Sequence, residues 1–339
     1  MRTLVTGGDG FVGQHLISHL LGTSREVAAT ILAERAADGT LSNAERGAVV
    51  WYRADVVDRD SVRAAVERWL PDEVFHLAGF ASGAAARERP TEAVRVNVGG
   101  TLNTLEAVAD SAASRFVTVV VAGSADAYGP PDETGAELTE STPLRPGSAY
   151  GGSKAGQERV ACAVAAARRL DVRIARLFPL VGPGQSENFV VPSFCRQASR
   201  IASGDRPAVL RVGNLDAERD FTHVRDGVRA LEALAGLDGP QHTTYNVCSE
   251  IGVRIGTVLD WILEEAGVRP TIEVDPARLR PDEPRRIVGS AERLRRETGW
   301  RVEHDVREGV RETYHWVRGR PEGDLPDNGH GEGRRWKSP

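Results

Sequence analysis

The sequence predicts an α/β fold, a Rossmann-type doubly wound parallel sheet with a smaller C-terminal lobe that binds the substrate. The first half of the chain alternates short β-rich runs with helical patterns, which is typical of βαβ units. A glycine-rich turn directly follows the first of these runs, and beyond residue 178 the pattern becomes irregular. A length of 339 residues suits a sheet domain with an added lobe better than one small domain.

The elements of the first half follow from β-rich runs and from apolar residues at helical spacing. The predicted strands are Leu4–Thr6, Val27–Leu32, Val49–Arg53, Val74–Leu77, Phe116–Ala122 and Val172–Leu177. The helices predicted between them are Phe11–Leu21, Ser61–Leu70, Thr91–Ala113 and Ala149–Leu170. The stretch Ala33–Gly47 has no periodicity and is expected to be a surface excursion.

The second half predicts the lobe, with a helix near Phe189–Ser203 and strands near Val209–Val212 and Thr243–Val247. We therefore assign residues 1–178 to a dinucleotide-binding domain, to which segments near 213–250 return. Residues 179–318 form mainly the substrate lobe. Residues 319–339 have almost nothing to bury and are expected to be a disordered tail.

The composition favours small-molecule partners. Forty-three basic and 48 acidic residues give a net charge of −5 with both signs spread along the chain, so no field that would recruit nucleic acid is visible. The longest apolar runs fall far short of the roughly 20 residues that a membrane span needs. No secretory leader is visible, and a cytoplasmic location is expected.

No metal site is expected. The cysteines Cys162, Cys195 and Cys248 have the spacing of neither a disulfide framework nor a zinc site, so all three are expected to be small buried hydrophobes. His15 and His19 share a helix face, but no carboxylate or cysteine completes a set of ligands.

A dinucleotide site is predicted at the first turn. Gly7 and Gly10 lie between the first strand and the helix that Phe11 and Val12 open, and Gly13 lies in the first turn of that helix. Glycine is needed there for a tight turn, for the approach of a pyrophosphate and for packing of the helix on the strand. Free N–H groups at the N-terminus of the helix suit phosphate. This position makes a dinucleotide site the favoured interpretation of a pattern that would be weak alone.

The end of the second strand bears on the choice between NAD(H) and NADP(H). An NAD site usually has an acidic residue there for the ribose 2′-hydroxyl, whereas this chain has Thr30-Ile31-Leu32. A 2′-phosphate could be accepted, with Arg35 either as its partner or as a solvated loop charge. Asp55 and Val56 are expected near the adenine, although Asp55 could instead cap the next helix.

Tyr150 and Lys154 lie four residues apart, so a helix places the phenol and the ammonium on one face. The only lysines in the chain are Lys154 and Lys337, so chance rarely produces this spacing. A free phenol titrates near 10. We expect the ammonium, with a nicotinamide charge, to lower the pKa of Tyr150 toward neutral.

Ser124 lies at the carboxyl end of the fifth strand, where a parallel sheet presents its ligand site. Its hydroxyl could share a hydrogen bond with a substrate oxygen and with Tyr150. Alone it would be an ordinary serine at the end of a strand, but beside Tyr150 and Lys154 it is a catalytic candidate.

Together these residues give the chain a clear resemblance to the extended short-chain dehydrogenases/reductases that act on nucleotide sugars, from residue 2 to about 318. The motifs that match in order and spacing are Thr6–Gly13, Phe75–Gly79, Asn97, Ser124 and Tyr150–Lys154. Later motifs are similar to those of the GDP-4-keto-6-deoxy-mannose reductases and the related GDP-mannose 4,6-dehydratases. These are Gly182–Gln185, Val212–Leu215, Arg219–Phe221, Val224–Asp226, Tyr245–Ser249 and Arg280–Glu283.

The resemblance implies binding roles. Arg219 and Arg280 would clamp the pyrophosphate of a sugar nucleotide with forked donors. Glu283 would bind the ribose of that nucleotide, and Val191 and Asn214 would line the base pocket, although each could instead be a surface charge or lobe packing. Further cofactor contacts are expected at Leu77, Ala78 and Asn97. Further substrate contacts are expected at Ser82, Asp126, Pro179 and Asn188.

Three departures from the family pattern bear on activity. Ala125-Asp126 stands where the dehydratases present Asp-Glu or Ser-Glu for elimination, which counts against a dehydratase. Pro179 replaces an asparagine that faces the sugar diphosphate, which puts the sugar in doubt. Gly79 replaces a usual alanine and could widen the pocket.

The resemblance implies NAD(P)H-dependent reduction of a 4-keto-6-deoxy nucleotide sugar, GDP-linked. Tyr150 would protonate the alkoxide, Ser124 would orient the ketone, and Lys154 would hold the cofactor ribose. A nucleotide-sugar 4-epimerase with tightly bound NAD fits Ala125 equally well. A 4,6-dehydratase or a non-catalytic dinucleotide sensor fits less well.

A homodimer is also expected. The predicted helices Thr91–Ala113 and Ala149–Leu170 carry apolar residues on more than one face. In the enzymes that the chain resembles, the corresponding pair of helices forms the dimer contact.

Overall fold

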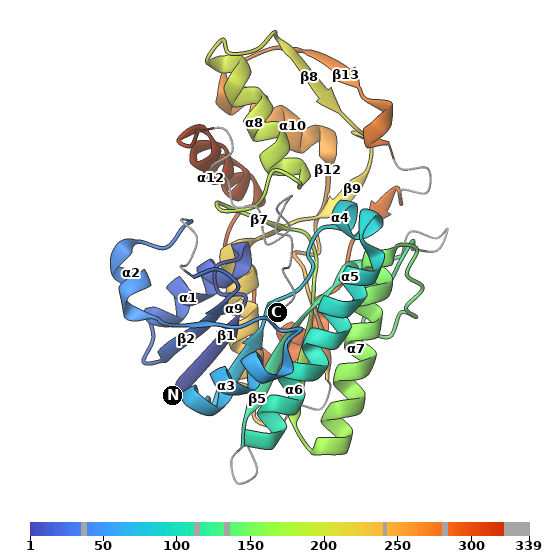
Figure 1. Cartoon of the computed structure of the whole chain (residues 1–339). Coiled ribbons are helices and arrows are strands. Elements are labelled where there is room, and N and C mark those ends of the chain that lie inside the picture. The colour runs from blue at the N-terminus through green and yellow to red at the C-terminus, as the bar shows by residue number, and fades with distance from the viewer. Residues whose placement is uncertain (35–38, 112–115, 132–135, 240–242, 280–283, 322–339) are drawn as a thin grey trace.

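The computed structural model describes residues 1–34, 39–111, 116–131, 136–239, 243–279 and 284–321 (Figure 1). At its centre is a seven-stranded sheet in the order β11-β6-β5-β4-β1-β2-β3. Every pairing in this sheet is parallel. Its strands are β1 (Arg2–Thr6), β2 (Glu26–Ile31), β3 (Val50–Arg53), β4 (Glu73–His76), β5 (Thr118–Ser124), β6 (Asp171–Leu177) and β11 (Thr244–Val247).

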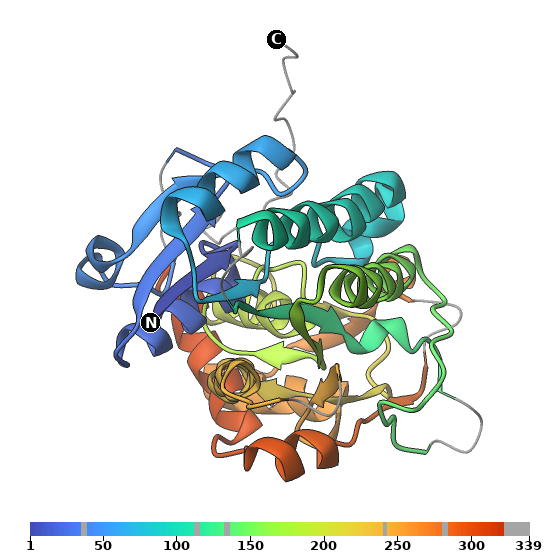
Figure 2. The same ribbon diagram turned by 90° about the horizontal axis from the view of Figure 1, so that it is seen from below.

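Helices cover both faces of the sheet, as a parallel sheet requires (Figures 1 and 2). Along β1, Leu4 packs in the core beneath one helical layer and Val5 in the core beneath the other, because side chains alternate along a strand. The layer on the Leu4 side comprises α3 (Arg59–Trp69), α6 (Gly100–Ser111) and α7 (Ala149–Arg168). The layer on the Val5 side includes α1 (Phe11–Leu21) and α9 (Val224–Ala235).

The strand order reverses at β1, which has β2 on one side and β4 on the other. In doubly wound sheets, ligands bind beyond the carboxyl ends of the strands at such a switch point. The structure therefore places the glycine-rich turn after β1 at the centre of a ligand-binding edge.

A smaller lobe lies over this edge of the sheet (Figure 1). Its own hydrophobic core joins three helices and one strand, which pairs in parallel with a second, exposed strand. These are α8 (Val190–Ala202), α10 (Ile255–Ala266), α12 (Val306–Arg318), β8 (Val209–Val212) and β13 (Thr271–Val274). Short sheets connect the lobe to the body: β7 (Leu180–Val181) pairs with β10 (Thr222–His223), and β9 (Glu218–Asp220) lies between β12 (Gly252–Arg254) and β14 (Arg286–Ile287).

Two predicted segments differ from the structure. The helix predicted at Thr91–Ala113 is α5 (Pro90–Val94), a π-helical turn η1 (Arg95–Gly99) and α6, and the turn holds Asn97 fully buried. The stretch Ala33–Gly47 was expected to be irregular, but α2 (Asn43–Ala48) begins within it. A capping box between Ser42 and Glu45 starts α2, so the sequence did carry a signal for this helix. The remaining short elements are α4 (Gly83–Glu88), η2 (Ala125–Ala127), η3 (Pro276–Arg278) and α11 (Glu292–Thr298).

Two smaller expectations are also corrected. Cys195 and Cys248 are buried as predicted, but Cys162 is only half-buried. The prediction of a tail from residue 319 falls largely on residues 322–339, which lie outside the described residues. Before them, Arg196 of α8 donates to the carbonyls of Val317 at 3.1 Å and Arg320 at 2.8 Å, so the chain is bound to the lobe through residue 320. In the part of the chain that the structure describes, no helix is long and apolar enough to cross a membrane.

A polar network ties β11 to the rest of the sheet. Arg176 of β6 donates to the carboxylate of Glu158 on α7 (Nε to Oε2, 2.9 Å) and to the hydroxyl of Tyr128 at 2.7 Å. Tyr128 in turn donates to Asn246 of β11 at 2.7 Å. Their side chains are almost fully buried, because they lie between α7, the turn after β5 and β11.

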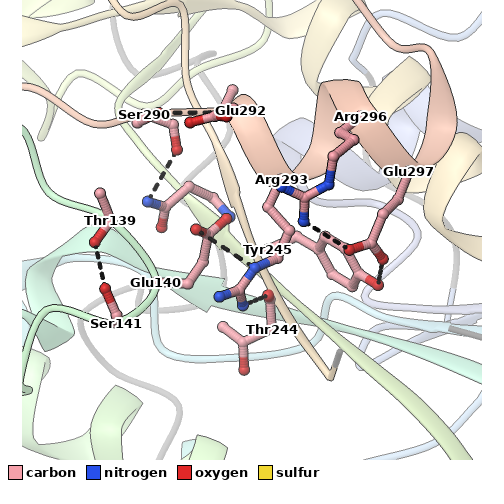
Figure 3. Close-up of polar contacts among 12 residues, drawn as sticks. Thr139, Glu140, Ser141, Thr244, Tyr245, Ser290, Glu292, Arg293, Arg296 and Glu297 are labelled. Atoms are coloured by element: carbon pink, nitrogen blue, oxygen red, sulfur yellow. Dashed lines mark hydrogen bonds and ion pairs between the residues drawn. The ribbon is translucent and has the colours of Figure 1, made fainter. Parts of the chain in front are cut away.

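Figure 3 shows the neighbouring contacts where α11 packs on β11. Arg293 donates to the carbonyl of Thr244 at 2.8 Å and lies 3.7 Å from the carboxylate of Glu140. Tyr245 donates to Glu297 at 2.7 Å. The edge strand is thus held by side chains on both sides as well as by its backbone pairing with β6.

The buried ion pair predicts a non-additive stability effect. Glu158→Leu should lower the free energy of unfolding by about 3 to 5 kcal/mol, because it leaves the Arg176 guanidinium buried without its counter-charge. Glu158→Leu combined with Arg176→Met should cost less than the single change, since it leaves no unpaired charge. Urea unfolding of both variants measures this, and a double variant that costs as much as Glu158→Leu or more would contradict it.

Candidate active site

The glycine-rich turn forms a cradle at the carboxyl end of β1. Gly7 has a φ of +69°, and a Cβ there would lie 2.9 Å from the backbone of Ala78 after β4. A Cβ on Gly13 would lie 2.3 Å from the carbonyl oxygen of Gly7, so the helix packs directly on the turn. Gly10 is the N-cap of α1 and supplies no side-chain cap, which leaves the first N–H groups of the helix available to phosphate. This geometry fits the pyrophosphate of a dinucleotide.

The end of β2 is turned toward the glycine-rich turn. Gly8 N donates to the carbonyl of Thr30 at 3.0 Å, and Gly7 N to its hydroxyl at 3.4 Å. The strand ends at Ile31 with no carboxylate at that point, and Leu32 is exposed. Arg35, the expected partner of a 2′-phosphate, lies outside the described residues.

At the end of β3, Asp55 does not cap the next helix. Its carboxylate accepts from Val57 N at 3.0 Å, whereas Asp58 is the N-cap of α3. The alternative interpretation of Asp55 as a helix cap is therefore wrong. The side chain of Val56 is buried beneath Gly100, so only its backbone can face a ligand.

Tyr150 and Ser124 meet where α7 begins. Ser148 caps α7, and Tyr150 lies in its first turn. A Cβ on Gly151 would lie 2.3 Å from the carbonyl oxygen of Asp126, so this turn packs tightly against η2, which follows β5. The hydroxyl oxygen of Ser124 accepts from Asp126 N at 3.2 Å, and Ser124 also hydrogen-bonds to the Tyr150 phenol.

The electrostatics of Tyr150 differ from the prediction. Burial raises the pKa of the phenol above its ordinary value, and the charge of Asp126 raises it further, while the hydrogen bond with Ser124 opposes both. The expected lowering by Lys154 is absent, because the ammonium is directed elsewhere. Lys154 Nζ donates to the carbonyl of Ala122 and to Gln157 Oε1, both at 2.9 Å, and burial lowers its pKa to about 8.

Asn97 binds protein groups with both ends of its amide. Its Oδ1 accepts from Phe80 N at 2.7 Å, and its Nδ2 donates to the Phe80 carbonyl at 3.2 Å and to Ser153 Oγ at 2.8 Å. Asn97 therefore joins the loop after β4 to α7, and its side chain, expected at the cofactor, acts through these elements. A Cβ on Gly79 would lie 2.9 Å from Asn97 Oδ1 and 3.5 Å from Lys154 Nζ, so the glycine leaves space beside the ammonium.

The expected substrate residues are spread over the lobe and its connections. Arg219 donates to the carbonyls of Glu218 and Pro284, both at 2.9 Å, and Asn214 Oδ1 accepts from Asp216 N at 2.9 Å. Val191 is buried in the lobe core rather than lining an open pocket. Arg280 and Glu283 lie outside the described residues.

The other expected substrate residues make local backbone contacts. Ser82 caps α4 by accepting from Ala85 N at 3.2 Å. The carbonyl of Pro179, in place of the asparagine of the family pattern, accepts from Thr222 N at 2.9 Å. Asn188 N donates to Ser186 Oγ at 3.3 Å, and Asp126 is exposed beside the phenol of Tyr150.

Sequence reasoning assigned no individual role to several buried polar residues, although Asp220 and His76 lie in motifs that it named. Asp220 accepts from the N–H groups of Ser249, Glu250 and Gly289. Burial raises its pKa to about 6, although these hydrogen bonds act to lower it. His76, Thr101 and Gln157 lie behind Lys154. The only sequence signal for Gln157 is its place three residues after Lys154, on the same helix face. Among the described residues, no group of three or more His, Cys, Asp or Glu side chains could hold a metal ion.

Comparison with known proteins identifies a matching family and several similar proteins. The family described as GDP-mannose 4,6 dehydratase matches residues 4–313. GDP-6-deoxy-D-mannose reductase of Pseudomonas aeruginosa is 32% identical over 312 residues, which are 91% of this chain and 95% of that protein. The solved structure of RMD from Pseudomonas aeruginosa complexed with NADPH has a TM-score of 0.81 and 30% identity, and covers 94% of this chain and 99% of its own. UDP-glucose 4-epimerase of Thermus thermophilus, solved with NAD, has a TM-score of 0.80 and 32% identity with the same coverage.

Proposed function

Since the chain belongs to the GDP-mannose 4,6-dehydratase family of extended short-chain dehydrogenases/reductases, we propose that it reduces a GDP-linked 4-keto-6-deoxy sugar with NADPH. The observation that carries the proposal is the phenol of Tyr150, hydrogen-bonded to Ser124 and held protonated by burial and by Asp126. Reduction of a ketone consumes one proton at the carbonyl oxygen, and a protonated phenol can supply it. The name of the Pseudomonas relative and the NADPH in the solved structure support the same reaction.

Each part of the site would have a separate role in this reaction. When bound, the dinucleotide would supply the hydride that reduces the sugar carbonyl. Gly7, Gly10 and the N-terminus of α1 would bind its pyrophosphate. Ser124 Oγ already accepts from Asp126 N, so its own hydrogen can point to the carbonyl oxygen, and Tyr150 donates a proton to that oxygen. The Lys154 ammonium, directed to Ala122 and Gln157, would hold the ribose of the dinucleotide with its remaining N–H.

The cofactor preference rests on the end of β2. No carboxylate lies at Ile31 to repel a 2′-phosphate, which is compatible with NADPH. A reductase must bind fresh reductant in each turnover, so the dinucleotide must also be exchangeable.

Tyr150→Phe tests the proton donor. The variant should bind NADPH almost as tightly as the unmodified protein, while kcat falls by roughly 10²- to 10⁴-fold, which is the usual contribution of a positioned general acid. Fluorescence titration and steady-state kinetics measure the two effects. Turnover that persists unchanged would remove Tyr150 from the mechanism.

A second candidate function is nucleotide-sugar 4-epimerisation. Ala125 replaces the dehydratase acid, and this change suits an epimerase as well as a reductase. The Thermus thermophilus relative, solved with NAD, is as similar in fold as the reductase. An epimerase returns the hydride to the same carbon, so it gains by never releasing its cofactor.

Cofactor consumption separates the two candidates. With a GDP-4-keto-6-deoxy sugar, we expect NADPH to disappear in a one-to-one ratio with product and to bind at least as well as NADH. Absorbance at 340 nm and chromatography of the sugar nucleotide measure this ratio. A purified protein that carries non-exchanging NAD and converts a nucleotide sugar with no net absorbance change is an epimerase, and the reductase proposal then fails.

We also propose a homodimer formed through α6 and α7. The two helices lie side by side on the outer surface of the body (Figures 1 and 2). Val94, which leads into η1 and α6, is 49% exposed, and Cys162 on α7 is half-buried. Sedimentation at micromolar concentration should give twice the chain mass of 36.6 kDa. A single species of the chain mass would contradict the dimer.

A further inference from the structure

A buried chain of hydrogen bonds reaches Lys154 from the far side of the active site. Gln157 Oε1 accepts from Lys154 Nζ at 2.9 Å, and Gln157 Nε2 donates to Thr101 Oγ1 of α6 at 2.8 Å. The same Thr101 oxygen lies 2.9 Å from Nε2 of His76, whose Nδ1 lies 2.9 Å from Thr6 Oγ1. The chain therefore links α7, α6, β4 and β1.

The whole chain is shielded from water. Thr6, His76, Thr101 and Gln157 are each no more than 1% exposed, and Lys154 is 6% exposed. Buried hydrogen bonds of this kind are strong and fix geometry, since water cannot replace a lost partner. The far end of the chain of hydrogen bonds is Thr6, the residue directly before the glycine-rich turn. Its Oγ1 accepts from Ala78 N at 3.2 Å.

From these contacts, we propose that Gln157 is a positioning residue that fixes the Lys154 ammonium against the Ala122 carbonyl and in register with the glycine-rich turn. Among the described residues, two of the three N–H donors of Lys154 are used by Ala122 and Gln157. The third N–H remains for the ligand side, where Gly79 leaves space. The role assigned to the ammonium rests on the proposed function, whereas its contact with Gln157 does not.

The charge of Lys154 depends on its acceptors, because burial favours the neutral amine. The titratable group that faces it among the described residues is His76 of β4, whereas the Tyr150 phenol of α7 interacts with Ser124 and with Asp126 of η2. Burial and the Lys154 charge lower the pKa of His76 to about 3, so this histidine is neutral at physiological pH. The oxygen of Gln157 is thus the one side-chain acceptor that the described residues offer to the ammonium.

Two variants at position 157 should move the pKa of Lys154 in opposite directions. Gln157→Leu replaces the amide with an apolar side chain of similar size and so removes the acceptor. It should lower the pKa of Lys154 by about 1 to 2 units, which corresponds to the loss of one hydrogen bond to a charged group. Gln157→Glu adds a carboxylate and should raise it. The protein has two lysines, so NMR of ¹³C-lysine-labelled full-length protein gives one titration for Lys154 and one for Lys337 as internal reference.

Activity supplies the second readout. The ammonium exists only below its pKa, so the alkaline limb of kcat/KM with NADPH should move to lower pH in Gln157→Leu and to higher pH in Gln157→Glu. Gln197→Leu is the matched control, because Gln197 is likewise a buried glutamine that uses both ends of its amide. Its partners are the backbone N–H and carbonyl of Arg211 in the lobe. It should leave the Lys154 titration unchanged.

A Lys154 pKa that stays constant in both Gln157 variants, or that shifts equally in Gln197→Leu, overturns the proposal. If Gln157→Leu does not fold, Gln157→Glu decides alone, and a Lys154 pKa that does not rise overturns the proposal. An unmodified protein that fails to consume NADPH refutes the proposed function, while the NMR titration still tests Gln157.

Discussion

The close packing of the glycine-rich turn on the sheet is the constraint on which the rest of this structure depends. Gly13 lies so close to Gly7 that no side chain fits between them, and this contact sets the direction in which α1 leaves β1. α1 then supports the lobe, since His15 hydrogen-bonds to the carbonyl of Pro183 at 2.7 Å and Phe11 lies beside Gly182. The same short contacts that shape the turn after β1 therefore also place the smaller lobe over it.

The candidate catalytic groups are arranged by buried polar contacts rather than by mutual attraction. Lys154 is directed at a carbonyl and an amide, while the phenol of Tyr150 is held by Ser124 and influenced by Asp126. Each group thus keeps its proton in the resting protein through its own surroundings. Such an arrangement suits an acid that must donate to a developing alkoxide, because the site does not have to reorganise during the reaction.

Much of the fold could be predicted because parallel strands buried on both faces give apolar runs and the glycine-rich turn has strict positions. The helix Phe11–Leu21 was predicted with its observed bounds, and the strand at Val209–Val212 likewise. The π-helical turn could not be predicted, because it depends on Asn97 binding Phe80 and Ser153, which lie far away in the sequence.

The same limit applies to the site. Tyr150, Lys154 and Ser124 are found from spacing and position, but the pKa shifts of Tyr150 and Lys154 are not. The spacing suggests that the Lys154 ammonium, one helical turn away, controls the pKa of the Tyr150 phenol. In the structure, that pKa is controlled mainly by burial and by the carboxylate of Asp126, which comes from another segment. The role of Gln157 was missed since it depends on Thr101, which an intervening strand separates from it in the sequence.

The late return of β11 to the central sheet has a consequence for biosynthesis. β11 pairs with β6, but the chain between them builds α8 and much of the lobe first, and α12 completes the lobe core only near the end of the described residues. While the chain emerges from the ribosome, β6 is therefore an open edge that can pair with other chains. A truncation before β11 that spares Ser124, Tyr150 and Lys154 would therefore still expose this edge to aggregation.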